Sequence, residues 1–278
     1  MDPEAAVMTW TELAHEYPAW GIVFAFLFGS CFGSFLNVCI WRIPLGESVI
    51  FAPSHCPKCN HHIKWYENIP LISYLALRGR CSECRQTITI RYFLVELLTA
   101  VLFAAAWAKL LYCGQPITLM WNYGALLMLA IPCAFIDVEH RLIPNKLTYT
   151  YLLFGLIFAV IFPENSLNWS QALAATVLAT AGTGVALWCF RFICNLLAKT
   201  DAFGLGDIKY MMAVAALCNW RGAAVILLIA SIFGTFFGIG LMIVLKDRKL
   251  KIPFAPFLAV GVVIYILGGD CVAGRFLP

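Results

Sequence analysis

Four cysteines form two pairs with the same spacing, and cysteines in this arrangement are typical metal ligands. Cys56 and Cys59 form the first pair, and Cys81 and Cys84 form the second. A gap of two residues lets both thiolates of a pair reach one ion, and two such pairs predict a tetrahedral Zn²⁺ site. The surrounding segment, 41–91, is too short to bury much apolar core, so a bound metal would supply the missing stability. Unbound structural thiols and a redox or disulfide role are the alternatives.

Two aspartates stand at the ends of long apolar runs. Asp137 ends one run, and Asp207 opens another directly after Gly204 and Gly206. Two carboxylates that share a site can hold one proton between them, so that one acts as a base and the other as an acid. Such a pair can activate water against a peptide carbonyl, and the glycines would let an extended peptide lie close to Asp207. Alternatively, each aspartate caps a helix, with Arg141 as a partner for Asp137.

The elements that carry these residues are predicted from the composition. Of 278 residues, 62% are hydrophobic and 12% are charged, against about 25% charged residues in soluble domains. This composition excludes a soluble enzyme, a disordered chain and a secreted disulfide scaffold. It predicts an all-α polytopic membrane protein, since open sheet edges do not occur in lipid. We expect about eight transmembrane helices, at 20–40, 92–112, 117–136, 147–162, 171–190, 208–219, 222–245 and 254–268.

The basic residues predict how the chain crosses the membrane. Sixteen of the 19 Lys and Arg residues fall in the segments 41–91, 137–146, 191–209 and 246–253. With eight spans these segments share one face, which the positive-inside rule makes cytoplasmic, and both termini lie outside. The acidic N-terminal stretch lacks the basic region of a cleavable signal peptide. Asp137 and Asp207 then lie at the same cytoplasmic surface, so a catalytic pair explains them as well as two separate caps do.

This topology predicts three parts of the chain. They are 1–40 (an outer stretch and the first helix), 41–91 (the cytoplasmic cysteine loop) and 92–278 (a membrane-embedded domain with both aspartates). A net charge of +4 does not suggest nucleic-acid binding. Cys113 and Cys271 fall near the outer face, where a disulfide is conceivable. Glu139, Glu96 and Asp201 are rival carboxylates.

An ordered set of motifs over nearly the whole chain resembles the bacterial type IV prepilin peptidases, which are bifunctional leader peptidases and N-methyltransferases. The motifs are Gly33-Ser34-Phe35-Leu36-Asn37, Arg42-Ile43-Pro44, the two cysteine pairs, Leu77-Arg78-Gly79-Arg80, Val95-Glu96-Leu97-Leu98, Asp137 before Ile143-Pro144, Gly204-Leu205-Gly206-Asp207-Ile208-Lys209, and Pro253-Phe254-Ala255-Pro256. In the last motif Ala255 stands where the family has glycine.

The resemblance implies a substrate and two reactions. Such enzymes cut the basic leader from type IV prepilins or pseudopilins after a glycine, at the cytoplasmic face of the bacterial inner membrane. They then methylate the new N-terminal residue, usually phenylalanine, with S-adenosylmethionine. Asp137 and Asp207 match the catalytic aspartates. The apolar helix of the substrate stays among the membrane lipids, next to the enzyme.

The resemblance also assigns the methyl transfer to the cysteine loop. Gly79 matches a family position linked to methylation. The rings of Trp65 and Tyr66 would either stack on the adenine of the cofactor or form the small core of the loop. Glu67 and Glu96 are further candidates for this function.

Two other functions share part of this pattern. A presenilin-like intramembrane protease would have the same Gly-x-Gly-Asp turn and would cut inside a transmembrane segment. A proton- or ion-coupled membrane protein would use the two carboxylates without being an enzyme.

Overall fold

The computed structural model describes residues 17–50, 54–56, 58–163, 168–198, 204–245 and 252–269. The N-terminal acidic stretch, Asp201 and Cys271 lie outside these ranges. The elements in chain order are α2 (Pro18–Arg42), the 3₁₀ helix η1 (Trp65–Asn68), α3 (Ile72–Ala76), α4 (Arg91–Tyr112), α5 (Leu119–His140), α6 (Asn145–Ile161), α7 (Trp169–Ala198), α8 (Leu205–Leu245), α9 (Ala255–Ile264) and the π-helical turn η2 (Tyr265–Gly269).

The described residues form no β-strand, so the prediction of an all-α fold is confirmed. Five helices, α2, α4, α5, α7 and α8, are long and apolar enough to cross a membrane, and α6 and α9 are shorter apolar helices. Each of the eight predicted spans is helical over most of its length. The chain is therefore a multi-pass membrane protein.

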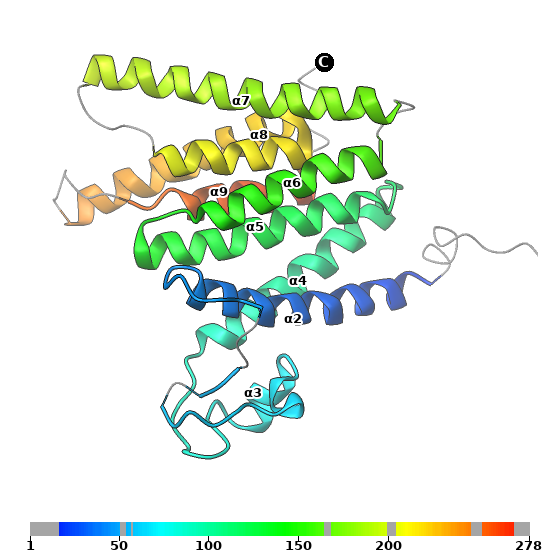
Figure 1. The fold of residues 1–278 in the computed structure, drawn as a ribbon, viewed down its shortest axis with the longest axis vertical. Helices are drawn as coiled ribbons and strands as arrows, with labels where there is room; N and C mark the ends of the chain where they lie inside the picture. The colour runs from blue at the N-terminus through cyan, green and yellow to red at the C-terminus, as the bar shows by residue number, and fades with distance from the viewer. Residues whose placement is uncertain are drawn as a thin grey trace, which may run out of the picture. The chain divides into compact units, whose positions relative to one another are not determined.

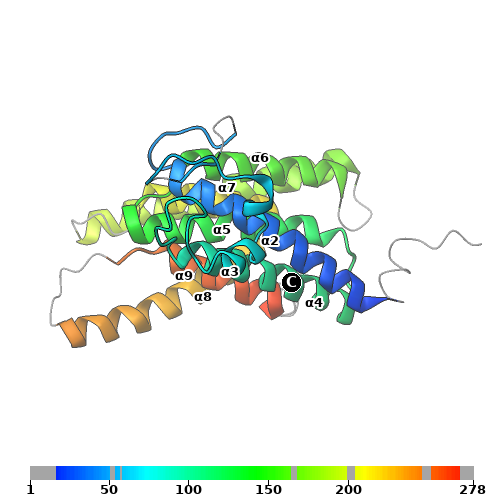
Figure 2. The same cartoon turned by 90° about the horizontal axis from the view of Figure 1, so that it is seen from below.

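The predicted sixth and seventh spans, 208–219 and 222–245, are the two arms of α8. The helix is interrupted at Cys218 and Asn219, whose backbone angles are not helical, and Asn219 has a positive φ of 64°. The chain reverses there, and the second arm returns toward the end where the first began (Figure 1, Figure 2). At 1.5 Å per residue the first arm, 205–217, is only about 20 Å long.

The chain divides into two compact units, 1–37 with 51–120 and 38–50 with 121–278. In the first unit α2 lies antiparallel to α4, and glycines of α2 form the seam. A Cβ at Gly29 would lie 2.7 Å from Cβ of Phe103, and one at Gly33 would lie 2.6 Å from Cα of Glu96. Small residues at helix–helix seams let membrane helices approach closely. At the end of the seam the Asn37 amide donates to the carbonyl of Tyr92 at 2.9 Å.

The second unit packs α5 to α9 around a seam of similar design. A Cβ at Gly155 of α6 would lie 2.6 Å from Cβ of Ala216 in the first arm of α8. A Cβ at Gly261 of α9 would lie 2.6 Å from the carbonyl oxygen of Ile226 in the second arm. The end of α5 and the beginnings of α6, α8 and α9 consequently meet at one end of this unit, on the left in Figure 1.

Candidate active site and metal centre

Asp137 lies three residues before the end of α5, and its side chain is buried. Its Oδ2 accepts a hydrogen bond of 3.0 Å from the backbone N–H of Ala255, and the N–H of Phe254 donates to the same carboxyl group. These N–H groups belong to the start of α9, where a helix leaves its first donors without internal partners. The residue that anchors Asp137, Ala255, thus lies 118 positions further along the chain. The sequence alone does not reveal this contact.

Ala255, which replaces the family's glycine, fits this position. It is the first residue of α9, it is fully buried, and its φ is not among the positive values found in the described residues. An alanine therefore costs no backbone strain here. The N–H that reaches Asp137 is a backbone group and is independent of the side chain.

Asp207 is the third residue of α8 and is partly exposed. Its carboxyl group accepts a hydrogen bond from the N–H of Gly204, the residue that precedes the helix. A side chain at the third position that binds the N–H before the helix is half of a capping box. Asp207 thus contributes to the cap from inside the helix and is not the N-cap residue itself, and the contact fixes its carboxyl group at the helix end.

The two aspartates belong to the same site. The charge of Asp137 acts on the carboxyl group of Asp207. The backbone segments that carry them also touch, because a Cβ at Gly206 would lie 3.2 Å from Cβ of Ile143, just after the end of α5. Gly206 therefore permits the close approach of these segments, and Gly204 leaves room for the Asp207 carboxyl group. The catalytic assignment itself stays a prediction.

Lys209, two residues after Asp207, contacts the start of α6. Its Nζ donates to Oδ1 of Asn145 at 2.9 Å and lies 5.5 Å from the ring centre of Tyr149. Both partners are in the first turns of α6. The motif around Asp207 contains the lysine, but neither Asn145 nor Tyr149 carries a sequence signal, because each is about 60 residues away along the chain.

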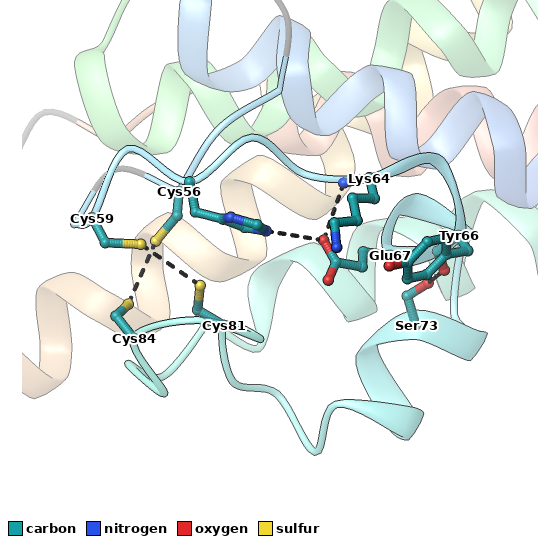
Figure 3. A network of polar contacts seen from close by, with 9 residues as sticks. Cys56, Cys59, Lys64, Tyr66, Glu67, Ser73, Cys81 and Cys84 are labelled. Carbon is teal, nitrogen blue, oxygen red and sulfur yellow. Dashed lines mark hydrogen bonds and ion pairs between the residues drawn. The ribbon is translucent and has the colours of Figure 1, made fainter.

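The four predicted metal ligands lie together in the cysteine loop. The sulfur atoms of the four cysteines are all within 4.8 Å of one another. The sulfur of Cys56 lies 3.9 Å from that of Cys84, and the sulfur of Cys59 lies 3.9 Å from that of Cys81 (Figure 3). Four thiolates about 2.3 Å from one Zn²⁺ in a tetrahedron would be about 3.8 Å apart. The cluster therefore fits a single zinc ion.

Each cysteine pair is a small hairpin with the same backbone hydrogen bonds. The N–H of Asn60 donates to the carbonyl of Cys56, and the N–H of Arg85 donates to the carbonyl of Cys81. Asn60 and Arg85 both have a positive φ, 59° and 58°. Around Cys56, the N–H groups of Cys59 and Lys58 lower the pKa of the thiol to about 7 and so favour the thiolate that a metal needs.

The first hairpin is tied to η1 by Glu67. Its Oε2 accepts from the N–H of Lys64 at 3.0 Å and lies 3.3 Å from Nε2 of His61. The N–H of Lys64, followed by the side chains of Ser82 and His61, lowers the pKa of the Glu67 carboxyl group. Ser73 of α3 donates to the carbonyl of Tyr66 at 2.9 Å and joins α3 to η1 (Figure 3). Glu67 thus has a structural role in the loop.

Gly79 lies in a tight turn between α3 and the second cysteine pair. Its φ is +64°, and a Cβ there would lie 2.8 Å from the hydroxyl oxygen of Tyr74. Its N–H donates to the carbonyl of Tyr74, and its carbonyl accepts from the N–H of Ile88. The structure gives Gly79 a conformational role, and its part in cofactor binding stays a prediction.

Glu96 holds the loop to α4. It is buried, and its Oε2 accepts a 2.8 Å hydrogen bond from the N–H of Leu71, which has a positive φ of 63°. The side chain of Ser34 also hydrogen-bonds to this carboxyl group. The sequence predicts Glu96 as a rival carboxylate or a candidate for methyl transfer, and in the structure it anchors the loop to α4.

The two aromatic residues of η1 are exposed. Trp65 is 81% exposed and Tyr66 is 48% exposed, with their rings edge to face at 5.7 Å. The prediction that they form the small core of the loop is therefore wrong, because backbone hydrogen bonds and the cluster of four cysteines hold this segment together instead. Their exposed rings keep the alternative, stacking on an adenine, available.

The fold defines the class of protein as an all-helical, multi-pass membrane protein with a cysteine loop. Comparison with known proteins identifies the family within this class. Residues 27–110 match the Bacterial Peptidase A24 N-terminal domain, and residues 124–239 match the Type IV leader peptidase family. The chain belongs to the type IV leader peptidase family and is an enzyme of the peptidase class.

Curated relatives agree with this assignment. A protein of Aeromonas hydrophila named Prepilin leader peptidase/N-methyltransferase is 36% identical, over 96% of this chain and 97% of its own length. A Legionella pneumophila protein of the same name is 35% identical, over 94% and 96%, and one of Myxococcus xanthus is 38% identical, over 87% and 69%. No solved structure is significantly similar to the chain. The alternative of a non-enzymatic, ion-coupled protein is overturned, because the chain belongs to a family of peptidases.

Proposed function

We propose that the protein is a bifunctional prepilin processing enzyme. It cleaves the basic leader of type IV prepilins or pseudopilins after a glycine, with Asp137 and Asp207 as the catalytic pair. It then methylates the new N-terminal residue, usually phenylalanine, with S-adenosylmethionine. The observation that carries the proposal is the meeting of two carboxyl groups, one buried and one partly exposed, at the converging ends of α5, α8 and α9.

The geometry supports a water-mediated cleavage by this pair. One carboxylate takes a proton from a water molecule as the water oxygen bonds to the carbon of the scissile peptide. The other carboxyl group gives its proton to the departing nitrogen. Asp137 is oriented by the N–H groups at the start of α9, and Asp207 by the N–H of Gly204. Both side chains are therefore positioned before a substrate binds.

The positive-inside rule supports a cytoplasmic site. The basic segments near both aspartates and in the cysteine loop favour the cytoplasmic side for each of them, with both termini outside. A basic leader is retained on the same side by the same rule, which brings the scissile bond to the membrane surface where the pair would act.

The cysteine loop supports the methyl transfer. Zn²⁺ held by Cys56, Cys59, Cys81 and Cys84 would stabilise a segment that has little apolar core. S-adenosylmethionine supplies the methyl group that the new N-terminal amine takes up. The exposed rings of Trp65 and Tyr66 offer faces for its adenine, and Gly79 sets the shape of the loop.

The test is an intact-mass measurement of a prepilin incubated with the purified protein and S-adenosylmethionine. Wild type should remove the leader and add the mass of one methyl group. Asp137→Asn and Asp207→Asn should leave the leader in place, whereas Glu139→Gln, at an exposed carboxyl group two residues from Asp137, should process normally. Normal processing by either aspartate variant would refute the pair. A cut within the apolar segment of the substrate would favour the presenilin-like alternative.

A further inference from the structure

An apolar groove of about 580 Å³ lies between α7 and both arms of α8. Its α7 wall is built from small residues about one turn apart, and its α8 wall includes Met211 and Leu227 from the two arms. The α7 residues are Ala175, Ala179, Gly182 and Ala186. From 175 to 186 this wall extends over about 17 Å at 1.5 Å per residue.

The groove begins close to the candidate active site. Met211, which lines it, is four residues after Asp207 on the first arm of α8, so the two side chains share one face of the helix. A Cβ at Gly184 of α7 would lie 2.9 Å from the sulfur of Met212, so Gly184 lies next to Met212 where α7 packs against this arm. The groove therefore runs from one turn past Asp207 toward Asn219, along the two helices.

The α7 wall has room for another helix. A Cβ at Gly182 would meet no other atom within 4 Å, and Leu178 at the groove edge is 72% exposed. Small residues repeated along one face let a neighbouring helix approach closely, as at the seams of α2 with α4 and of α6 with α8. In those seams the glycines are covered, whereas at Gly182 the space is open.

We propose that this groove binds the apolar helix of the substrate, directly after the scissile bond. The inference rests on the proposed function. A prepilin whose cleavage site lies at Asp207 continues into an apolar segment that must stay in the bilayer, and the groove starts one turn from Asp207 and follows the membrane-spanning direction of α7. The groove thus recognises the mature part of the substrate, while the aspartates act on the bond before it.

Filling the groove tests this assignment kinetically. Gly182→Leu places a side chain in the open space, and Gly240→Leu is the matched control, because a Cβ at Gly240 also meets nothing within 4 Å but lies on the second arm outside the groove. In proteoliposomes with a full-length prepilin, Gly182→Leu should raise KM about tenfold at nearly unchanged kcat, the factor that corresponds to about 1.4 kcal/mol of lost binding. The control should match wild type.

Site-specific photo-crosslinking supplies a second readout. A benzophenone amino acid at Leu178, which lines the groove, should crosslink to the apolar segment of a prepilin, whereas the same probe at Val177, exposed but outside the groove, should not. Crosslinks at Leu178 to lipid alone, or a wild-type KM for Gly182→Leu, would overturn the groove while leaving the peptidase intact. A wild-type protein that leaves the prepilin uncut would instead refute the proposed function itself.

Discussion

Replacing Gly204 by alanine should impair cleavage without destabilising the protein. A Cβ at Gly204 would lie 2.8 Å from Oδ2 of Asp207, and its next neighbours are atoms of the same aspartate, at 3.6 and 4.0 Å. Among the described residues, the added methyl group therefore collides only with the end of this side chain. Gly204 also has no positive φ that would make alanine strained.

The size of the effect follows from the required displacement. An ordinary carbon–oxygen contact is about 3.4 Å, so Oδ2 must move by about 0.6 Å. Rotating a short side chain by this amount costs about 0.5–1.5 kcal/mol at most, which is a small part of the stability of a domain. A misplacement of about 1 Å in an active site can cost about 100-fold in rate. We therefore expect a fall of about 10- to 100-fold in kcat for leader cleavage.

The assay compares the initial rate of prepilin cleavage with the thermal unfolding midpoint in detergent. Gly240→Ala is the control, because it adds the same methyl group to open space on α8. Gly204→Ala should keep the unfolding midpoint and the KM of wild type and lose rate, while Gly240→Ala should change neither. Normal cleavage by Gly204→Ala would mean that the position of the Asp207 carboxyl group does not limit the reaction, and would refute the reasoning.

Three further predictions concern the cysteine loop. Gly79→Ala should lower methyl transfer and leave leader cleavage near wild type, because its Cβ pushes the Tyr74 ring aside and its backbone has a positive φ. The control is Gly114→Ala, which has a φ of +63° but open space around its Cβ. Equal methylation by both variants would contradict the steric argument. Cys59→Ser should release zinc at lower chelator concentration than wild type, measured with a chromogenic zinc indicator; an unchanged zinc content would exclude the four-cysteine site. Glu67→Gln should be less stable than wild type above about pH 5, and the difference should disappear as the pH falls through the lowered pKa of Glu67, because a carboxylate with a lowered pKa stabilises the folded state only while it is ionised. A stability difference that grows on acidification would refute this role.

The helices could be predicted because their signals are local. An apolar run long enough to cross a bilayer must be helical whatever its neighbours are, so the longer spans follow from hydropathy. The short run 208–219 follows from the basic residues, because eight spans bring all four basic segments to one face. The signal of the cysteine pairs is also local, since a gap of two residues brings two sulfur atoms to one side of a turn. The lengths of the apolar runs thus predict the membrane helices, and the spacing of the cysteines predicts the candidate metal ligands.

The exposure of Trp65 could not be predicted. An aromatic residue beside a zinc site ordinarily packs into a small core, but here backbone hydrogen bonds and the sulfur cluster hold the loop together, and the ring stays in solvent. The reversal at Asn219 was anticipated only as a break between two apolar runs. Its positive φ and the return of the second arm of α8 depend on packing between α6, α8 and α9.

Composition and residue spacing suffice to predict an all-helical membrane protein with a four-cysteine loop and two aspartates at the ends of apolar runs, because none of these features depends on contacts between distant residues. The surroundings of Asp137 depend on the packing of the helices: the N–H of Ala255, 118 residues away at the start of α9, donates to its carboxyl group. The same is true of Lys209 with Asn145, and of the open space at Gly182. Contacts between distant helix ends depend on how whole helices pack, and no local pattern encodes them.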